Sequence, residues 1–191
     1  DGVYVPGAEG TIQSLVETET LGNTTTHYVN EVLGHLKRKR STRTAFEDFD
    51  KDLDVVNLKN CMINMQTGEI LPHSSEYLSL CQLDVVYDPN VNGREWKNFW
   101  SSVMPESPEG VELFTDHAAM TLRRRPYKKD LMGYGETDTA KSTALKILKN
   151  FLGAENTSHV SLHDIVNEKF MLPELDGKMA NIYPDIEADE L

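Results

Sequence analysis

The sequence has few of the features that would assign it to a zinc-binding, secreted or membrane-embedded class. Its only cysteines are Cys61 and Cys81, and neither they nor the six histidines show the paired spacing of a metal site. No apolar run approaches the roughly 20 residues that a membrane-spanning helix needs, and the N-terminus lacks the layout of a signal peptide. We therefore expect a cytoplasmic, globular chain with reduced thiols and no membrane partner.

Positive charge is scarce as well. Nineteen Lys and Arg residues stand against 31 Asp and Glu residues, and the net charge of −12 argues against a free-standing nucleic-acid-binding protein. The cations are clustered, at Lys37–Arg40 with Arg43 and at Arg123–Arg125 with Lys128 and Lys129. Either cluster could contact phosphates. The first could equally be a solvated helix end, where cations suit the helix dipole, and the second could be a linker.

The most informative stretch is segment 133–143, which reads Gly-Tyr-Gly-Glu-Thr-Asp-Thr-Ala-Lys-Ser-Thr. From Gly135 it follows the phosphate-loop pattern, with Ala140 in place of the last glycine. The short run Asp130–Tyr134 is expected to be the strand before the loop. Residues 141–152 carry apolar side chains at helical spacing. The sequence therefore predicts a strand, a phosphate-binding loop and a helix in succession.

Each part of such a loop has a chemical role. Loop N–H groups and the positive N-terminal end of the next helix surround phosphate oxygens. Lys141 would reach the β- and γ-phosphates of ATP, and the Ser142 hydroxyl would help to hold Mg²⁺. If Ala140 needs a positive φ angle, its Cβ costs about 1 kcal/mol, which is tolerable. The alternative is an ordinary strand–turn–helix with a chance Lys-Ser pair. The predicted nucleotide-binding residues are Gly135, Glu136, Thr137, Asp138, Thr139, Ala140, Lys141, Ser142 and Thr143.

A strand that ends in acidic residues is the second element that a nucleotidase needs, and Met179–Glu187 has this form. Asp185 is expected to bind Mg²⁺ through water, and Glu187 to orient the attacking water. Pro184 fits only at the end or edge of a strand. The alternative is that both acids are solvated side chains of a loop. Together with Lys141, Asp185 and Glu187 form the predicted catalytic set.

The N-terminal part is expected to be helical. Residues 12–16 and 29–36 carry apolar side chains at helical spacing, and Asn23 or a neighbouring threonine could cap the second helix. That helix ends in the first basic cluster. Thr44 and Glu47 match a capping box, which predicts a short third helix.

Short strands follow. The runs 55–58, 62–65 and 70–71 are apolar, and the turn at Gln66–Glu69 joins the last two, so a hairpin is expected. Residues 78–87 contain another apolar piece that could be extended. The predicted fold class is therefore α+β: a helical and hairpin N-terminal module, followed by the beginning of an α/β P-loop (AAA+-like) ATPase core.

Two tryptophans lie on one face of the next predicted helix, together with Phe99 and Val103. Trp96 and Trp100 could form a base-stacking platform, but core packing is the favoured interpretation. Ser107-Pro108 then reads as the start of a further helix. The predicted domain division is a helical segment at 1–54, a mixed module at 55–126 and the ATPase part at 127–191.

The whole chain resembles a known family. Four stretches resemble the module that precedes the helicase in viral and plasmid primase-helicases. They are Asn57–Asn60, Thr67–His73, Tyr77–Ser79 and Tyr87–Pro89. This is the phage/plasmid primase C-terminal family, related to the poxvirus primase-helicase. The ATPase loop of this family resembles Gly135–Glu136 with Lys141–Thr143. The segment that follows it resembles Val160–Asp164, Phe170, Leu175–Lys178 and Ala180–Asp185.

The resemblance implies a superfamily 3 helicase, in which an AAA+ core forms hexameric rings and moves along DNA by ATP hydrolysis. By position, Lys141 and Ser142 would be nucleotide and Mg²⁺ ligands, and Asp185 the residue of the acidic strand. The expected partners are single-stranded or forked DNA, further copies in a homo-hexamer, and a primase domain in cis or in trans. The family loop is usually richer in glycine than this one, in which Thr137, Thr139 and Ala140 replace small flexible residues.

Two hypotheses follow for the function. In the first, the chain is a fragment of an ATP-driven replicative helicase whose later motifs lie beyond Leu191, so that the fragment alone is not a competent helicase. In the second, it is a non-catalytic adaptor that contacts DNA and has a degenerate phosphate loop. Nucleotide binding that depends on Lys141 distinguishes the first hypothesis from the second.

Overall fold

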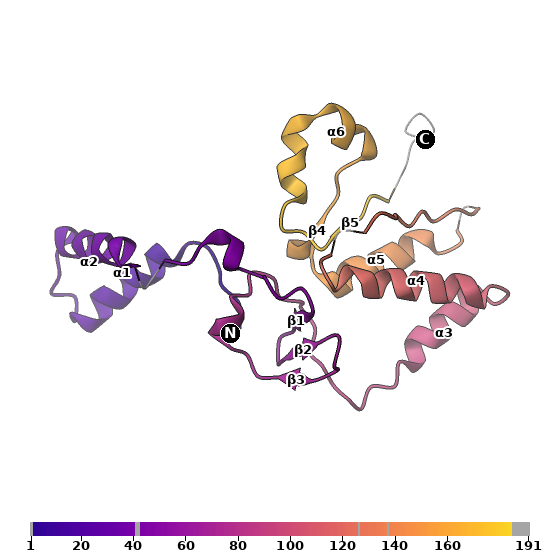
Figure 1. The fold of residues 1–191 in the computed structure, drawn as a ribbon, viewed down its shortest axis with the longest axis horizontal. Helices are drawn as coiled ribbons and strands as arrows, with labels where there is room; N and C mark the ends of the chain where they lie inside the picture. Colours follow the sequence, from indigo (N-terminus) through magenta and orange to yellow (C-terminus); the bar gives the residue numbers. More distant parts are fainter. Residues whose placement is uncertain (1, 41–42, 126, 137, 185–191) are drawn as a thin grey trace. The chain divides into compact units, whose positions relative to one another are not determined.

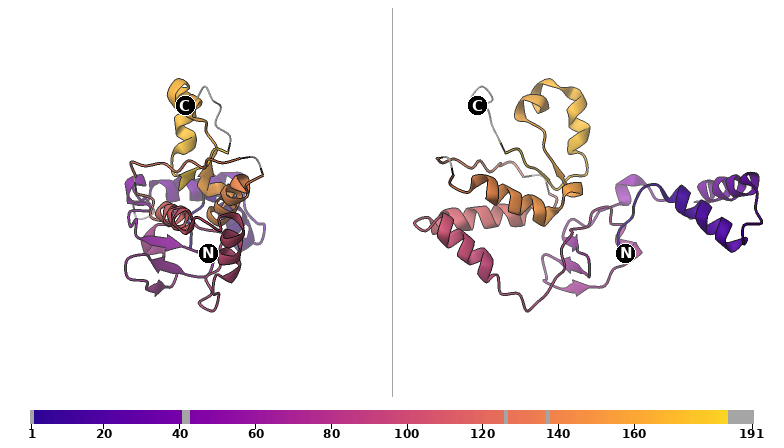
Figure 2. Two further views of the ribbon diagram at one scale, coloured as in Figure 1. Left: turned by 90° about the vertical axis from the view of Figure 1, so that its right-hand side faces the viewer. Right: turned by 180° about the vertical axis from the view of Figure 1, so that it is seen from behind.

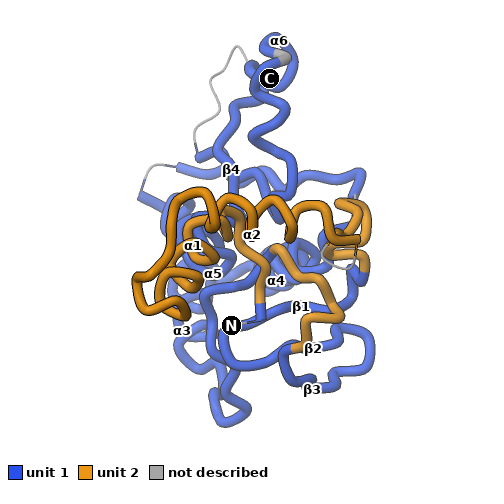
Figure 3. Tube along the Cα trace, turned by 90° about the vertical axis from the view of Figure 1, so that its left-hand side faces the viewer, with its two compact units in different colours: residues 1–2, 52–73, 81–191 blue, residues 3–51, 74–80 orange. Residues whose placement is uncertain are grey.

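The computed structural model describes residues 2–40, 43–125, 127–136 and 138–184 (Figure 1). They form two compact units, which Figure 3 shows in different colours. Unit 2 consists of residues 3–51 and 74–80, and unit 1 of the described residues within 1–2, 52–73 and 81–191. Helices and small sheets are mixed in the chain, which confirms the α+β class. The domain boundaries and the ATPase core stay predictions.

Unit 2 contains an antiparallel pair of helices, α1 (Ala8–Glu19) and α2 (Thr26–Arg38). The Oγ1 atom of Thr25 accepts a hydrogen bond from the N–H of Tyr28 at 3.3 Å and caps α2. A cap of this kind satisfies one of the free N–H groups in the first turn of a helix. Both predicted helices are confirmed, and the cap falls on one of the threonines expected to provide it.

The third predicted helix is wrong in extent. Only a three-residue 3-10 turn, η2 (Phe46–Asp48), forms there, and its N-cap residue is Ala45 without a side-chain cap. A capping box stabilises a helix only when an apolar face follows that can be buried. Here a polar stretch follows instead, and the carboxylate of Asp50 accepts a hydrogen bond from the N–H of Leu80 at 3.1 Å. The residues after η2 are therefore hydrogen-bonded to the segment that follows η3 (Ser75–Tyr77).

In unit 1 the predicted hairpin is confirmed as a three-stranded antiparallel sheet. Its strands are β1 (Val55–Asn57), β2 (Met62–Asn64) and β3 (Ile70–Leu71), in that order. Asn64 closes the turn between β2 and β3. Its Oδ1 accepts hydrogen bonds from the N–H groups of Gln66 and Thr67 at 2.9 and 3.1 Å. Gly68 supplies the left-handed residue of this turn, with a φ of 73°.

The apolar piece at 78–87 is extended only locally. Leu83 forms a parallel bridge with Leu58, and its N–H donates to the carbonyl of Asn57 at 2.9 Å. Leu83 itself is 1% exposed. This segment therefore contributes a core side chain to the hairpin without becoming a strand of its own.

Two helices follow, α3 (Arg94–Val103) and α4 (Pro108–Thr121). The ring of Trp100 is 3% exposed and packs against the rings of Trp96 and Phe114, with centroids 5.4 and 4.7 Å away. A ring buried in this way is part of the core and cannot stack on a base. Core packing, which the sequence favoured, is confirmed for Trp100.

The C-terminal part of unit 1 places a helix before a small parallel sheet. The elements are α5 (Lys141–Leu152), η4 (Ala154–Asn156), β4 (Thr157–Ser158), α6 (Leu162–Asn167), η5 (Lys169–Leu175) and β5 (Ala180–Asn181). Strands β4 and β5 pair in parallel, with Thr157 opposite Ala180. Figure 2 shows α4 and α5 side by side. The predicted helix at 141–152 is confirmed, and the predicted acidic strand begins as β5.

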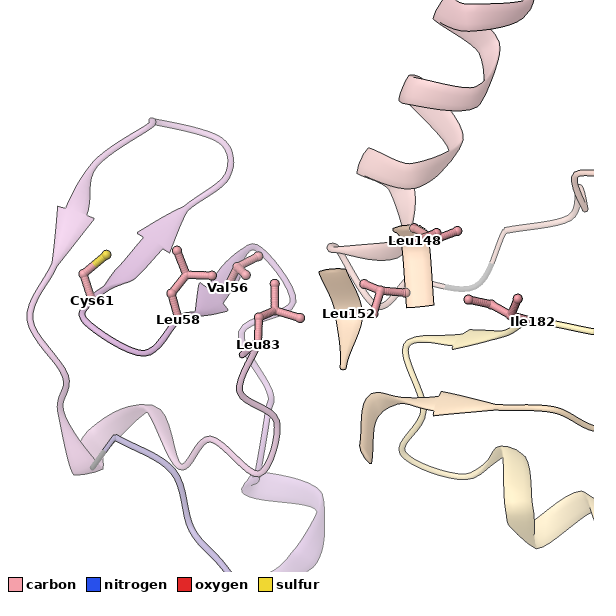
Figure 4. Close-up of a cluster of buried hydrophobic side chains, with 7 residues drawn as sticks. All are labelled: Val56, Leu58, Cys61, Leu83, Leu148, Leu152 and Ile182. Atoms are coloured by element: carbon pink, nitrogen blue, oxygen red, sulfur yellow. The ribbon is translucent and has the colours of Figure 1, made fainter. Parts of the chain in front are cut away.

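One hydrophobic cluster joins the hairpin to these C-terminal elements (Figure 4). Leu152 is fully buried in it, and Phe114, Ala118 and Leu122 of the α4 region pack against it. The buried members of the cluster are Val56, Leu58, Cys61, Leu83, Leu148, Leu152 and Ile182. The helix that begins at Lys141 is therefore anchored on the hairpin sheet through its C-terminal half.

Candidate nucleotide-binding loop

The loop meets α5 at Ala140 and Lys141. Ala140 is the N-cap residue, and its carbonyl accepts the first helical hydrogen bond from the N–H of Ala144 at 3.0 Å. No acidic residue lies in the first turn of this 12-residue helix. The partial positive charge of the helix N-terminus is therefore not offset by a carboxylate there, as an anion site requires.

Lys141 is held by its own loop. Its Nζ atom donates to the carbonyl of Gly135 at 2.8 Å, to the carbonyl of Glu136, and to Oγ1 of Thr139 at 3.0 Å. These three oxygens match the three N–H bonds of an ammonium group. Thr139 in turn donates to the Glu136 carbonyl at 2.7 Å. The ammonium group thus lies inside the loop segment predicted to surround phosphates.

Among the described residues of the loop, two that have a Cβ atom are left-handed. Ala140 has φ 60° and ψ 15°, and Asp138 has φ 60°. The positive φ considered for Ala140 from the sequence is thus present. Its Cβ destabilises this conformation by about 1 kcal/mol relative to glycine. At Gly135 an added Cβ would lie 3.2 Å from Oγ1 of Thr139, so the close approach favours glycine at this position.

The strand predicted before the loop is not formed. Residues 127–136 have no strand, and Tyr134 is 97% exposed. A strand forms only where a neighbour pairs with its backbone N–H and C=O groups. Among the described residues, β4 and β5 pair with each other and not with this run. The apolar composition of Asp130–Tyr134 was therefore insufficient to predict its conformation.

The remaining predicted site residues are either exposed in or beside the loop or lie outside the described part of the chain. Ser142 and Thr143 are exposed in the first turn of α5, and Glu136 and Asp138 are exposed in the loop. Thr137, Asp185 and Glu187 lie outside the described residues, so their roles stay predictions. The chain leading to Asp185 is fixed as far as Asn181, whose Oδ1 accepts hydrogen bonds from Ser158 at 3.0 Å and from the N–H of Val160 at 2.8 Å.

Sequence reasoning missed the ionic cluster around Asp54. Its two carboxylate oxygens accept from Arg123 Nη2 at 2.9 Å, from Arg125 Nη2 at 2.6 Å and from Gln66 Nε2 at 2.7 Å. Partial burial alone would raise the pKa of this carboxyl group, but the hydrogen bond from Arg123 and the charges of both arginines outweigh it, and the pKa of Asp54 is lowered. The arginine run was visible in the sequence, but its partner, 69 and 71 residues earlier, was not.

A second residue that sequence reasoning missed is Asn156, which is 7% exposed. Its Nδ2 donates to the carbonyl of Leu152 at 2.7 Å and to that of Gln82 at 2.9 Å, and its Oδ1 accepts from the thiol of Cys81 at 2.9 Å. The backbone carbonyl of Asn156 accepts from the N–H of Met179. One side chain thus ties the end of α5 to the hairpin module.

Within the described part of the chain, no three His, Cys, Asp or Glu side chains gather in a group that could hold a metal ion. A P-loop Mg²⁺ site does not need such a group, because one hydroxyl and phosphate oxygens supply most of its protein and substrate ligands. No disulfide joins Cys61 and Cys81, and Cys61 is buried. No described helix has both the length and the apolar character that crossing a membrane requires.

The comparison with known families identifies the first half of the chain. A family model described as D5 N terminal like matches residues 10–105, about half of the sequence. The chain belongs to this family. The D5_N module is found in primase-helicase proteins of phages and viruses, which places the chain in the context of DNA replication. No curated protein matches the sequence.

The family assignment confirms part of the predicted relationship. The D5_N match covers α1 from residue 10, then α2, the hairpin sheet and α3, and it ends before α4. The phosphate loop and the acidic strand lie outside the matched residues. The relation to primase-helicases is therefore established for the N-terminal module, and the helicase part of the resemblance stays a prediction.

Proposed function

We propose that residues 135–143 bind the phosphates of ATP, and that this D5_N chain is part of an ATP-dependent replicative helicase of superfamily 3. The full-length protein would hydrolyse ATP and move along single-stranded or forked DNA as a homo-hexameric ring. A primase domain would act with it in cis or in trans. The observation that carries the proposal is the position of Lys141, whose ammonium group lies within its own loop at an acid-free helix N-terminus.

The residues present fit a nucleotide phosphate. The loop oxygens that accept hydrogen bonds from Lys141 belong to neutral carbonyl and hydroxyl groups. They therefore do not balance the positive charge of its ammonium group. Phosphate oxygens carry charge and form stronger hydrogen bonds to an ammonium group. Binding of ATP would therefore exchange neutral acceptors for charged ones. The exposed hydroxyl of Ser142 is the group that would hold Mg²⁺, which neutralises the developing charge on the phosphates when bound.

The remaining steps depend on residues near the C-terminus of the chain. Asp185 would bind Mg²⁺ through water, and Glu187 would orient the water that attacks the γ-phosphate. The parallel pairing of β5 with β4 supports a strand that leads toward Asp185. Ile182, which follows β5 directly, is buried in the core of unit 1.

The test is a titration with a fluorescent ATP analogue, with and without Mg²⁺. We expect Mg²⁺-dependent binding by the wild-type chain and loss of that binding in Lys141→Ala. Lys146→Ala is the matched control, because Lys146 lies on the exposed surface of the same helix. Binding that Lys141→Ala leaves unchanged would remove the proposed role of the loop. Absence of binding in a chain extended past the acidic strand would do the same.

A second function is favoured by one observation, the left-handed Ala140 in a loop without its preceding strand. In this alternative the chain is a non-catalytic adaptor that contacts DNA. Asp54 engages Arg123 and Arg125, so DNA contact would depend mainly on Lys37–Arg40. The adaptor would bind a labelled oligonucleotide in a salt-dependent manner and would not bind the ATP analogue.

A further inference from the structure

Unit 2 contains a groove of about 520 Å³ between its two long helices. Its floor is aliphatic and consists of Ile12 from α1 with Leu33 and Leu36 from α2. Its rim carries Glu9, Lys37 and Arg43. Unit 2 does not contain the phosphate loop, so this groove belongs to a different part of the chain from the proposed nucleotide site.

The helices that form the groove bury little of their apolar surface. In the described part of unit 2, α1 has no buried residue, and the buried apolar side chains are Val29 and Leu33, both on α2. Leu15 on α1 is 57% exposed, and Tyr28 on α2 is 52% exposed. Isolated helices of this length are marginal in water without packing against an apolar surface. A partner that covered the groove would add the burial that this helical pair lacks.

The rim of the groove is cationic in an otherwise acidic chain. Five of the 19 Lys and Arg residues lie within positions 37–43, although the net charge of the chain is −12. The Nε atom of Arg43 donates to the backbone carbonyl of Lys37 at 2.9 Å, which keeps both cations at the groove. Glu9 is the acidic group in the lining, and it pairs with Lys37 at 2.6 Å. The local charge is therefore complementary to an acidic ligand.

We propose that this groove docks an acidic amphipathic helix of a partner protein. Aliphatic side chains of that helix would lie on Ile12, Leu33 and Leu36, and its Asp or Glu residues would pair with Lys37 and Arg43. An amphipathic helix in a hydrophobic groove is a recurrent mode of recognition, and rim charges select the partner. Nucleic acid fits less well, because the lining formed by the described residues has no aromatic ring to stack on bases, and its floor is aliphatic.

The probe is a fluorescein-labelled synthetic peptide of about five helical turns, with leucines at helical spacing on one face and glutamates elsewhere. Anisotropy of this peptide is measured against the full chain, beside a peptide of the same composition in scrambled order. We expect binding of the patterned peptide only. Arg43→Glu should weaken it roughly tenfold, whereas Arg40→Glu, outside the lining, should change it less than about twofold. Amide hydrogen exchange should slow in α1 when the peptide binds.

Three results would overturn the proposal. One is that the patterned and scrambled peptides bind equally, which indicates charge attraction without a groove. Another is equal weakening by Arg43→Glu and Arg40→Glu. The third is no peptide binding up to about 100 µM. If in that case a single-stranded oligonucleotide binds and both charge reversals weaken it, the cluster is a nucleic-acid contact. The outcome is independent of the ATP titration, because the phosphate loop is unchanged in all of these variants.

Discussion

The Lys141 ammonium group donates a hydrogen bond to the backbone carbonyl of Gly135 over 2.8 Å, across the whole predicted phosphate loop. The side chain that would bind phosphates therefore also holds the loop closed. Thr139 adds a second anchor, since its hydroxyl group accepts from Lys141 at 3.0 Å and donates to the Glu136 carbonyl. Both functions of Lys141 can be separated experimentally, because only one of them needs a nucleotide.

Lys141→Ala should loosen the loop when no nucleotide is present. The substitution removes the hydrogen bonds from Nζ to Gly135, Glu136 and Thr139, so the loop keeps only the bond from Thr139 to the Glu136 carbonyl. We expect amide hydrogen exchange in this segment to become faster, while the core of α5 keeps its protection. Lys146→Ala on the same helix should leave the exchange of the loop unchanged. Equal exchange in wild type and Lys141→Ala would contradict the closed loop.

Ala140→Gly should stabilise the chain. The Cβ of Ala140 destabilises the folded state at φ 60°, and its removal should raise the free energy of unfolding by about 1 kcal/mol. Part of this gain is offset because glycine has a larger conformational entropy in the unfolded state. We expect a net stabilisation of up to about 1 kcal/mol, which is a rise in Tm of roughly 2–4 °C for a chain of this size. The measurement is thermal unfolding followed by circular dichroism.

The matched control for Ala140→Gly is Ala119→Gly. Ala119 is exposed in α4, where glycine is less favourable than alanine by about 1 kcal/mol. The same chemical change should therefore have opposite signs at the two positions. A lower Tm for both variants would show that Ala140 is not held in the left-handed conformation in solution.

Local patterns in the sequence predicted local structure well. The helix at 141–152, the cap at a threonine before α2 and the hairpin at 55–71 each depend on side chains near each other in the sequence, and all three are present. The capping box at Thr44 and Glu47 is the exception, because a cap contributes too little to form a helix that has no apolar face to bury.

Features that depend on distant residues could not be predicted in this way. The run Asp130–Tyr134 has the composition of a strand, but pairing is decided by a neighbour that a sequence pattern does not identify. The partnership of Asp54 with Arg123 and the burial of Asn156 both join residues about 70 positions apart. In the candidate site, the residue types and their order were visible, whereas the position of the Lys141 ammonium group inside the loop was not.

Asp54→Asn should destabilise unit 1 at neutral pH. The pKa of Asp54 is lowered in the folded chain, so its carboxylate contributes stability at pH values above the ordinary range near 4, and this contribution is lost as the pH falls through the lowered pKa. We expect a lower Tm for the variant at pH 7 and a shrinking difference from wild type below about pH 4. Asp176→Asn, in an exposed turn, is the control and should follow wild type throughout. A difference that stays constant with pH would exclude the ion pair as its cause.

Asn156→Ala should weaken the link between α5 and the hairpin module. The substitution removes an amide that donates to the buried end of α5 at Leu152 and to Gln82, and it leaves these carbonyls without that donor. An unsatisfied buried polar group costs about 1–3 kcal/mol, so Tm should fall by several degrees. Because the Cys81 thiol loses its acceptor on Asn156, its reaction with a thiol reagent should become faster at the same time.

The control for this last variant is Asn23→Ala, because Asn23 is exposed before α2. This substitution should change the free energy of unfolding by less than about 0.5 kcal/mol. The two readouts of Asn156→Ala separate a local effect from a global one. A lower Tm with unchanged reactivity of Cys81 would mean that Asn156 stabilises α5 alone. A lower Tm with faster reaction of Cys81 would mean that the amide couples the helix of the proposed phosphate loop to the family module, as its hydrogen bonds to Leu152 and Gln82 indicate.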